Sequence, residues 1–485
     1  MANILLAYNN RADAASYAGG AWVASGGVAL SNLGTKDIGG LARSSSAAVT
    51  STRFRFDIAA SRTLRTLSLL NHNLSTAATV RMRAGRAVFD VDWASYTAED
   101  RATFSGGAGG SRVTSAGALA AATTPRITYT PGTLVALGLL TEEQLTNHLR
   151  NNSMTDAVAG TPGTAPTNWT IGSVSGVTSS VVGTGSDGGV VYIDLRWAGT
   201  ASTGGSLTVY FEALTGITAS TGQTWNISAY LKLQAGSLGG LNSVNFVVDE
   251  NTAGGGFVAN GLYALSSPTS ASLIEQRQSA TRTLSGGGTV ARVRPYLFVP
   301  VSNGAVIDVT LRIGYPQMGL SSFASSVTPT TTAQVTRTAD STTVTSSNFT
   351  GIHSATAGTL YAEFNLLAAT GTRPIISLDD NTANERIEMY VSGTDLKFRV
   401  IDGGVTQCDI AIGTIAASTF YKVAVAWSAN DFAGCLSGGT VQTDTAGTLP
   451  TVDRMRIGSD QAGNFQNGHQ KRTARFLERL TNAEL

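Results

Sequence analysis

The chain has 485 residues, 13% of them charged, with a net charge of +1 and 55 glycines. Soluble domains usually carry about 25% charged residues. The net charge near zero gives no electrostatic case for nucleic-acid binding. The low fraction of charged residues together with the many glycines favours turn-rich sheets. Residues 1–10 lack a signal-peptide pattern, no stretch reaches the ~18 apolar residues of a membrane helix, and two cysteines make no disulfide framework.

Residues 1–93 alternate between apolar and polar side chains, which predicts strands with one polar face. In the segment 53–57, Phe54 and Phe56 lie on one side and the charged residues on the other. The segment 71–73 (Asn-His-Asn) either closes a turn or presents a ligand-facing loop. The order of these segments resembles the N-terminal discoidin-like domain of phage tail proteins, which implies a β-sandwich with an attachment role.

Residues 94–150 are expected to be a Gly-rich connector with a short hairpin around 115–117 and one short helix over 142–150. Thr141 and Gln144 have the spacing of a capping box, and Leu140 with Leu145 that of a hydrophobic staple. Arg150 falls in the last turn, where it favours the helix dipole. The sequence therefore predicts a helical clasp between two strand-rich regions.

Two stretches resemble segments of tailed-phage virion proteins. The first stretch carries the resemblance at Pro125, Arg126, Tyr129, Gly138, Leu139, Leu140, Glu142, Glu143, Thr146 and Asn147. The second, in a linker that joins two lectin-like domains in those proteins, matches at Val335, Thr336, Arg337, Ala339 and Asp340. The resemblance implies a virion component and does not specify a function.

Residues 151–320 show short alternating strands separated by turn signals, which predict a β-sandwich. The pattern resembles carbohydrate-binding modules, in which exposed aromatic rings stack on sugars. Trp169, Trp197 and Trp225 are expected in the core. The polar register carries the candidate glycan-binding residues Tyr192, Tyr210, Tyr230, Asp194, Glu212 and Lys232. Three tyrosines on three strands would line one face if the strands were neighbours; alternatively, they pack under a neighbouring domain or subunit.

Residues 321–347 are Ser/Thr-rich and are expected to form an extended linker. Residues 348–485 again alternate as strands, with a hairpin turn at 392–395. Their ending resembles concanavalin-like and laminin-G-like domains, some of which bind calcium. Only Asp379, Asp380 and Asn381 are candidates here, and they read equally well as a turn, so no metal site and no cofactor is expected.

The chain carries no nucleotide-binding loop and no nucleophile elbow. Its four histidines have no metal-ligand spacing, and no pair of carboxylates stands out for glycoside cleavage. We therefore expect a protein that is not an enzyme. A glycan-cleaving spike on a parallel β-helix would show a fixed short repeat, which the sequence lacks.

Together these features predict an all-β protein of three jelly-roll-like sandwiches joined by Gly/Ser/Thr-rich connectors. The resemblance implies a tail fibre, spike or other virion appendage that binds host surface polysaccharide. It also implies other virion proteins and copies of itself, as a trimer, as partners, and assembly in the host cytoplasm before release. The alternatives are a purely structural connector of tail, collar or head, and a glycan-depolymerising tailspike.

Overall fold

The computed structural model describes residues 16–18, 55–57, 87–96, 99 and 101–485. They belong to two compact units, one covering Met1–Phe89 with Thr97–Arg101 and the other Asp90–Tyr96 with Ala102–Leu485. In the first unit, β1 (Ser16–Ala18) pairs with β2 (Arg55–Asp57). Residues 87–92 of the predicted N-terminal sandwich form β3, which belongs to the eight-stranded sheet described below. The other residues of that prediction, including the turn at 71–73, lie outside the described residues.

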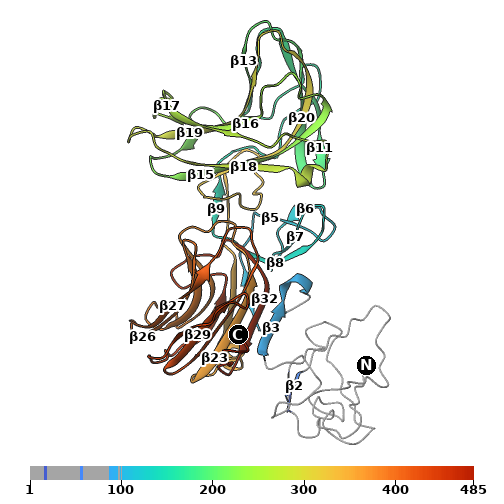
Figure 1. The fold of residues 1–485 in the computed structure, drawn as a ribbon. Helices are drawn as coiled ribbons and strands as arrows, with labels where there is room; N and C mark the ends of the chain where they lie inside the picture. The colour runs from blue at the N-terminus through green and yellow to red at the C-terminus, as the bar shows by residue number, and fades with distance from the viewer. Residues whose placement is uncertain (1–15, 19–54, 58–86, 97–98, 100) are drawn as a thin grey trace, which may run out of the picture. The chain divides into compact units, whose positions relative to one another are not determined.

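The described chain is built almost entirely from strands, which confirms the all-β prediction (Figure 1). Its helical elements are α1 (Ser346–Thr350) and the short 3-10 turns η3 (Trp93–Ser95) and η4 (Leu273–Glu275). None of the helices in these residues has the length and apolar character needed to cross a membrane.

A middle sandwich packs a six-stranded sheet against a five-stranded sheet (Figure 1). The first sheet has the order β10-β13-β19-β16-β17, with β14 paired to β19. Its strands are β10 (Thr170–Gly172), β13 (Gly205–Tyr210), β14 (Ile217–Thr218), β16 (Asn245–Asn251), β17 (Phe257–Ala264) and β19 (Arg292–Val301). The second, in the order β11-β12-β20-β15-β18, contains β11 (Val177–Asp187), β12 (Val190–Thr200), β15 (Thr224–Gly236), β18 (Arg277–Thr283) and β20 (Val306–Gly319).

The core of the middle sandwich follows from the period-2 pattern, because alternate side chains of a strand point to opposite faces. In β12, Ile193, Leu195 and Trp197 are fully buried between the sheets. Trp169 and Trp225 are buried in the same core, as predicted. The opposite register of each strand points away from this core, to the outer faces of the sandwich.

The C-terminal sandwich has a seven-stranded and an eight-stranded sheet. The first has the order β27-β26-β25-β24-β31-β22-β4 and contains β4 (Thr103–Ser105), β22 (Ser341–Thr345), β24 (Thr372–Asp379), β25 (Arg386–Ser392), β26 (Asp395–Asp402), β27 (Val405–Thr414) and β31 (Arg454–Ile457). The second follows β30-β29-β28-β23-β32-β8-β7 and contains β3 (Ala87–Asp92), β7 (Ile127–Tyr129), β8 (Ala136–Thr141), β23 (Ala357–Phe364), β28 (Tyr421–Ser428), β29 (Asp431–Leu436), β30 (Gln442–Asp444) and β32 (Gly468–Phe476).

Aromatic rings link the two sheets of the C-terminal sandwich: Phe398 of β26 lies 6.3 Å from Trp427 of β28 between ring centroids. The predicted hairpin is present, since β25 and β26 pair with Ser392 opposite Asp395. Cys408 and Cys435 are free, buried thiols. The predicted connector hairpin is also present, as β5 (Ser111–Val113) paired with β6 (Leu119–Ala121).

The prediction of a helix over 142–150 is wrong. Residues up to Thr141 form β8, and Leu145–Asn147 form β9, which pairs with β21 (Val335–Arg337). The Thr141 hydroxyl, the expected cap, is buried without a hydrogen-bond partner among the described residues. A capping box favours a helix by only about 1 kcal/mol, so strand pairing and the ion pairs of Glu142 outweigh it.

The expectation that 321–347 form an extended, unpacked linker is also wrong. Residues 335–337 form β21, and residues 341–345 form β22 inside the seven-stranded sheet. Buried Ser325 and Thr328 are both hydrogen-bonded to Gln317. A Ser/Thr-rich segment can therefore pack, because hydroxyls and backbone groups find hydrogen-bond partners when they leave water.

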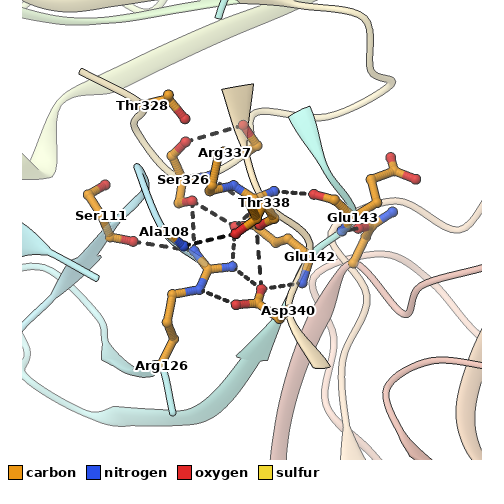
Figure 2. Close-up of polar contacts among 12 residues, drawn as sticks. Ala108, Ser111, Arg126, Glu142, Glu143, Ser326, Thr328, Arg337, Thr338 and Asp340 are labelled. Atoms are coloured by element: carbon orange, nitrogen blue, oxygen red, sulfur yellow. Dashed lines mark hydrogen bonds and ion pairs between the residues drawn. The ribbon is translucent and has the colours of Figure 1, made fainter. Parts of the chain in front are cut away.

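The two connecting segments meet in a buried charge cluster formed by Arg126, Glu142, Arg337 and Asp340 (Figure 2). Arg126 donates from Nε to Asp340 (2.9 Å) and from Nη2 to Glu142 (2.7 Å). Arg337 lies 3.7 Å from each carboxylate. Ser326 donates to Glu142 from both its backbone N–H (2.8 Å) and its hydroxyl (2.7 Å). Two cations and two anions thus neutralise one another out of water.

Burial alone would raise the pKa of Glu142, but the guanidinium groups of Arg337 and Arg126 outweigh it and hold that pKa below its usual range. Burial raises the pKa of Asp340, against the opposing effect of Arg126. The cluster therefore holds Glu142 as a carboxylate, and its charge compensates the two buried arginines.

Replacing Glu142 by Gln should destabilise the protein by about 3–5 kcal/mol, because it leaves a buried cation uncompensated. Urea unfolding of the parent and the variant would measure the loss. The control is Glu143→Gln, at a more exposed carboxylate 3.8 Å from Arg373, which should cost less than about 1 kcal/mol. Equal effects of the two changes would contradict a structural role for the cluster.

Acid should weaken the C-terminal sandwich through His469, which is buried on β32 with Nδ1 3.1 Å from Asn365 Oδ1. Burial lowers the pKa of His469 to about 4, whereas an unfolded histidine titrates near 6.5. The resulting stability is complete above about pH 6.5 and is lost as the pH falls toward 4.

His469→Gln should therefore lose less stability than the parent between pH 7.5 and pH 4.5, by up to about 2.5 kcal/mol. The measurement is urea unfolding across this pH range, with the change in stability compared between the two proteins. Parallel pH profiles would show that His469 does not titrate in this way.

Candidate functional site

Tyr192 and Tyr230, two of the predicted glycan-binding residues, lie on the outer face of the five-stranded sheet. Tyr192 on β12 and Tyr230 on β15 are both opposite Gly314 of β20, so the three residues form one row across the sheet. To this extent the structure brings the predicted residues together.

Tyr230 is covered and not free to stack on a sugar. It is 4% exposed and packs in a second apolar cluster with Leu273 and Ile274 of η4, Tyr315 and Val327. Burial raises the pKa of its hydroxyl. The alternative interpretation expected cover by a neighbouring domain or subunit, whereas Tyr230 is covered by η4 of its own sandwich and by Val327.

Tyr192 is half-buried, and its ring carries the guanidinium of Arg312 at 3.6 Å from the centroid. Asp194 accepts two hydrogen bonds from the same guanidinium, at 2.8 and 3.0 Å. Lys232 lies 3.8 Å from Asp187, which also binds Arg312. The predicted polar partners therefore satisfy one another within the sheet.

Tyr210 is the last residue of β13 in the opposite sheet, and Glu212 follows that strand, so the three tyrosines do not share one face. Glu212 is 1% exposed, and its carboxylate accepts hydrogen bonds from the backbone N–H of Arg150 (3.0 Å) and from Arg150 Nε (3.1 Å). Glu212 therefore fixes the chain where it enters the middle sandwich and does not face a ligand.

The outer face of the six-stranded sheet carries a group that we call the aromatic face, formed by Tyr210, Tyr296, Phe298, Arg294 and Asp249. Tyr210 and Tyr296 are opposite each other on β13 and β19, with ring centroids 4.6 Å apart. Phe298 meets Tyr296 edge-on at 6.2 Å. Tyr210 and Phe298 are half-buried, whereas Tyr296 is 7% exposed.

Two charged side chains complete the aromatic face. The guanidinium of Arg294 lies over the Tyr210 ring at 4.0 Å, and its Nη2 donates to Asp249 at 3.1 Å. The Tyr296 hydroxyl donates to the other oxygen of Asp249 at 3.3 Å. Burial raises the pKa of Asp249 against the pull of Arg294. Burial and then the charge of Asp249 raise the pKa of Tyr296.

This arrangement combines ring surfaces with a few oriented hydrogen-bonding groups, which is the composition of a small-ligand site. The sequence prediction found Tyr210 and missed Tyr296, Phe298, Arg294 and Asp249. Alternation in 292–301 places Arg294, Tyr296 and Phe298 on one side, so the signal was present. Nothing in the sequence pairs β19 with β13.

The candidate calcium loop contains a buried carboxylate that is already paired. Asp379 is fully buried and accepts from Arg456 at 3.0 Å, while Asp380 accepts from the Thr382 backbone N–H within the turn. Within the described parts of the chain, no group of three or more His, Cys, Asp and Glu side chains is placed to hold a metal ion.

No family model and no curated protein matches this sequence. Among solved structures, the CBM40 domain of the Ruminococcus gnavus IT-sialidase is 14% identical with a TM-score of 0.24, covering 27% of this chain and 82% of that one. The NanB sialidase of Streptococcus pneumoniae (12% identity, TM-score 0.26) covers 29% of this chain and 25% of its own. The binding domain of botulinum neurotoxin DC (9% identity, TM-score 0.25) covers 30% and 38%. At these TM-scores, the similarity to these structures supports no conclusion about the fold or the function of this chain.

The two outer faces should respond differently to loss of a tyrosine ring. Tyr230→Ala should destabilise the protein by about 3–5 kcal/mol, as for other fully buried rings. Tyr210→Ala should cost less, because its ring is only partly buried. Urea unfolding of both variants is the measurement, and an equal cost would contradict the difference in burial.

Proposed function

We propose that this protein is a non-enzymatic component of a tailed-phage virion that binds host surface glycans. The observation that carries the glycan proposal is the aromatic face, where the half-buried rings of Tyr210 and Phe298 adjoin Arg294 and Asp249. Apolar ring surfaces stack on the flat faces of sugars, and neighbouring donors and acceptors bond the hydroxyls. The outer face of the five-stranded sheet lacks such a combination of rings and polar groups, because Tyr230 is covered.

The virion proposal is supported by the two stretches that resemble tailed-phage proteins. Arg126, Glu142, Arg337 and Asp340 all belong to these stretches, and they form the buried charge cluster. The resemblance thus falls on residues that have a structural role where the two connecting segments meet. Such a role suits a protein whose domains are held in a fixed relation. A tail-fibre, spike or other appendage position is part of the proposal, as is assembly with other virion proteins.

A single open site of this size should bind weakly, since each stacked ring contributes about 1 kcal/mol. Copies displayed together would raise the apparent affinity through effective concentration. We therefore include self-assembly, with a trimer as the form that the fibre resemblance implies.

A glycan array that includes bacterial surface polysaccharides would test the proposal. The parent should be retained on at least one polysaccharide, and Tyr210→Ala with Phe298→Ala should reduce retention by about tenfold or more. The matched control is Tyr192→Ala, which removes a half-buried tyrosine on the other sheet and should leave retention unchanged.

The same experiment separates the alternatives. A purely structural connector would show no retention on any polysaccharide. A depolymerising spike would release oligosaccharides from the retained polysaccharide, and that release would disappear on substitution of a carboxylate. Retention without release is the expected result.

A further inference from the structure

We propose that β17, an edge strand of the six-stranded sheet, pairs antiparallel with β17 of a second copy of this chain. The pairing joins the two six-stranded sheets into one continuous sheet. It needs no ligand, so it can be tested apart from the glycan proposal, and only its consequence for glycan retention rests on that proposed function.

The backbone of β17 has an open outer side. Within the described chain, β17 is the last strand of its sheet, at the margin of the middle sandwich, and pairs with β16 alone (Figure 1). The backbone N–H of Leu265 donates to the carbonyl of Val244 at 2.9 Å and continues this ladder. Alternate residues of an antiparallel ladder bond the same neighbour. The outward backbone groups are therefore those of Asn260, Leu262 and Ala264, and all three residues are exposed.

β17 lacks the features by which natural sheet edges avoid pairing, which are charged side chains, prolines and cover by other segments. Its sequence, FVANGLYA, contains no charged residue and no proline. Two of its large apolar side chains, Phe257 and Leu262, are 65% and 58% exposed. Arg282 lies close to Gly261 of this strand, but its charge is paired with the buried carboxylate of Glu250.

The comparable edge strands of the two sandwiches, β11, β18 and β27, are each protected. On the free side of β11, the backbone N–H of Val181 donates to the carbonyl of Pro162, and its carbonyl accepts from the N–H of Gly160, both at 2.8 Å. β18, with the sequence RQSATRT, carries two arginines, and β27 carries the exposed Asp409. The absence of protection is therefore a particular property of β17 among these strands.

A second copy of β17 is the partner that this edge fits. An uncharged strand meets its own copy without electrostatic repulsion, whereas a charged segment would find no opposite charge here. A two-fold axis through Leu262 places this residue opposite its own copy, and Asn260 opposite Ala264 of the second copy. The outward backbone groups then exchange about six hydrogen bonds. The two exposed leucines form an apolar cross-strand pair.

The pairing has a consequence for glycan binding. Residues directly opposite each other in paired strands share one face of the sheet, so the aromatic faces of the two copies point in the same direction. The strands β19, β16 and β17 of each copy lie between the two β13 strands, which separates the two copies of Tyr210 by about 34 Å along the sheet. Two sites that face one surface raise the apparent affinity through effective concentration.

Sedimentation velocity of the full chain without glycan, over a series of concentrations, tests the pairing. The parent should form dimers as the concentration rises. Leu262→Lys places two like charges opposite each other, and Leu262→Pro removes an outward N–H at a position where an edge strand tolerates proline. Each change should weaken dimerisation about tenfold or more, and urea unfolding of each variant checks that it folds.

An equimolar mixture of Leu262→Lys and Leu262→Glu should restore dimers, because opposite charges then face each other across the axis. The matched control is Val306→Lys, which places the same charge at another exposed apolar position (73%) at the start of β20 and should leave dimerisation unchanged. A monomeric parent, oligomers of the parent that both Leu262→Lys and Leu262→Pro leave intact, or a mixture that stays monomeric would overturn this inference. These outcomes are distinct from failure of the glycan proposal, which the array tests by itself.

Discussion

The buried charge cluster of Arg126, Glu142, Arg337 and Asp340 is the interaction on which the second unit of this protein depends. Each ion has lost its water, and only the mutual attraction of all four with their hydrogen bonds offsets that cost. The backbone comes close to make this possible: a Cβ on Gly110 would lie 2.3 Å from Arg337 Cδ, and one on Gly107 would lie 2.7 Å from Asp340 Oδ1. Removing one ion is therefore more destabilising than the absence of the whole cluster would be.

The cluster also explains why two polar connecting segments are ordered. β9 pairs with β21, β8 joins β32, and Asn147 bonds Thr328 and the backbone of Met318. Both segments thereby contribute strands and hydrogen bonds to the compact second unit. The resemblance to phage virion proteins therefore falls on residues that hold this junction together. It carries no information about a ligand.

The ligand proposal depends on a difference between two outer faces of one sandwich. Both carry a tyrosine with a stacked arginine, Tyr192 with Arg312 and Tyr210 with Arg294. Next to Tyr192, η4 and Val327 cover the sheet. Next to Tyr210, the rings of Tyr296 and Phe298 follow on β19. A rigid sheet presents such rings with little ordering cost on binding, which favours an open, multivalent mode of recognition.

The sequence by itself determined the all-β class and, within each strand, which residues face the core, because alternation is a local consequence of the pleat. It therefore placed Trp197 and Trp225 inside and Tyr192 and Tyr210 outside. Alternation does not state which strands are neighbours, so only the strand order separated Tyr210 from Tyr192 and joined it to Tyr296. Capping signals near Thr141 were likewise local. Besides Arg126, Glu142 contacts Ser326, Arg337 and Asp340, which all lie more than 180 residues away. This long-range ion pair, the long-range hydrogen bonds and the strand pairings are together stronger than any cap, and they decided the structure there.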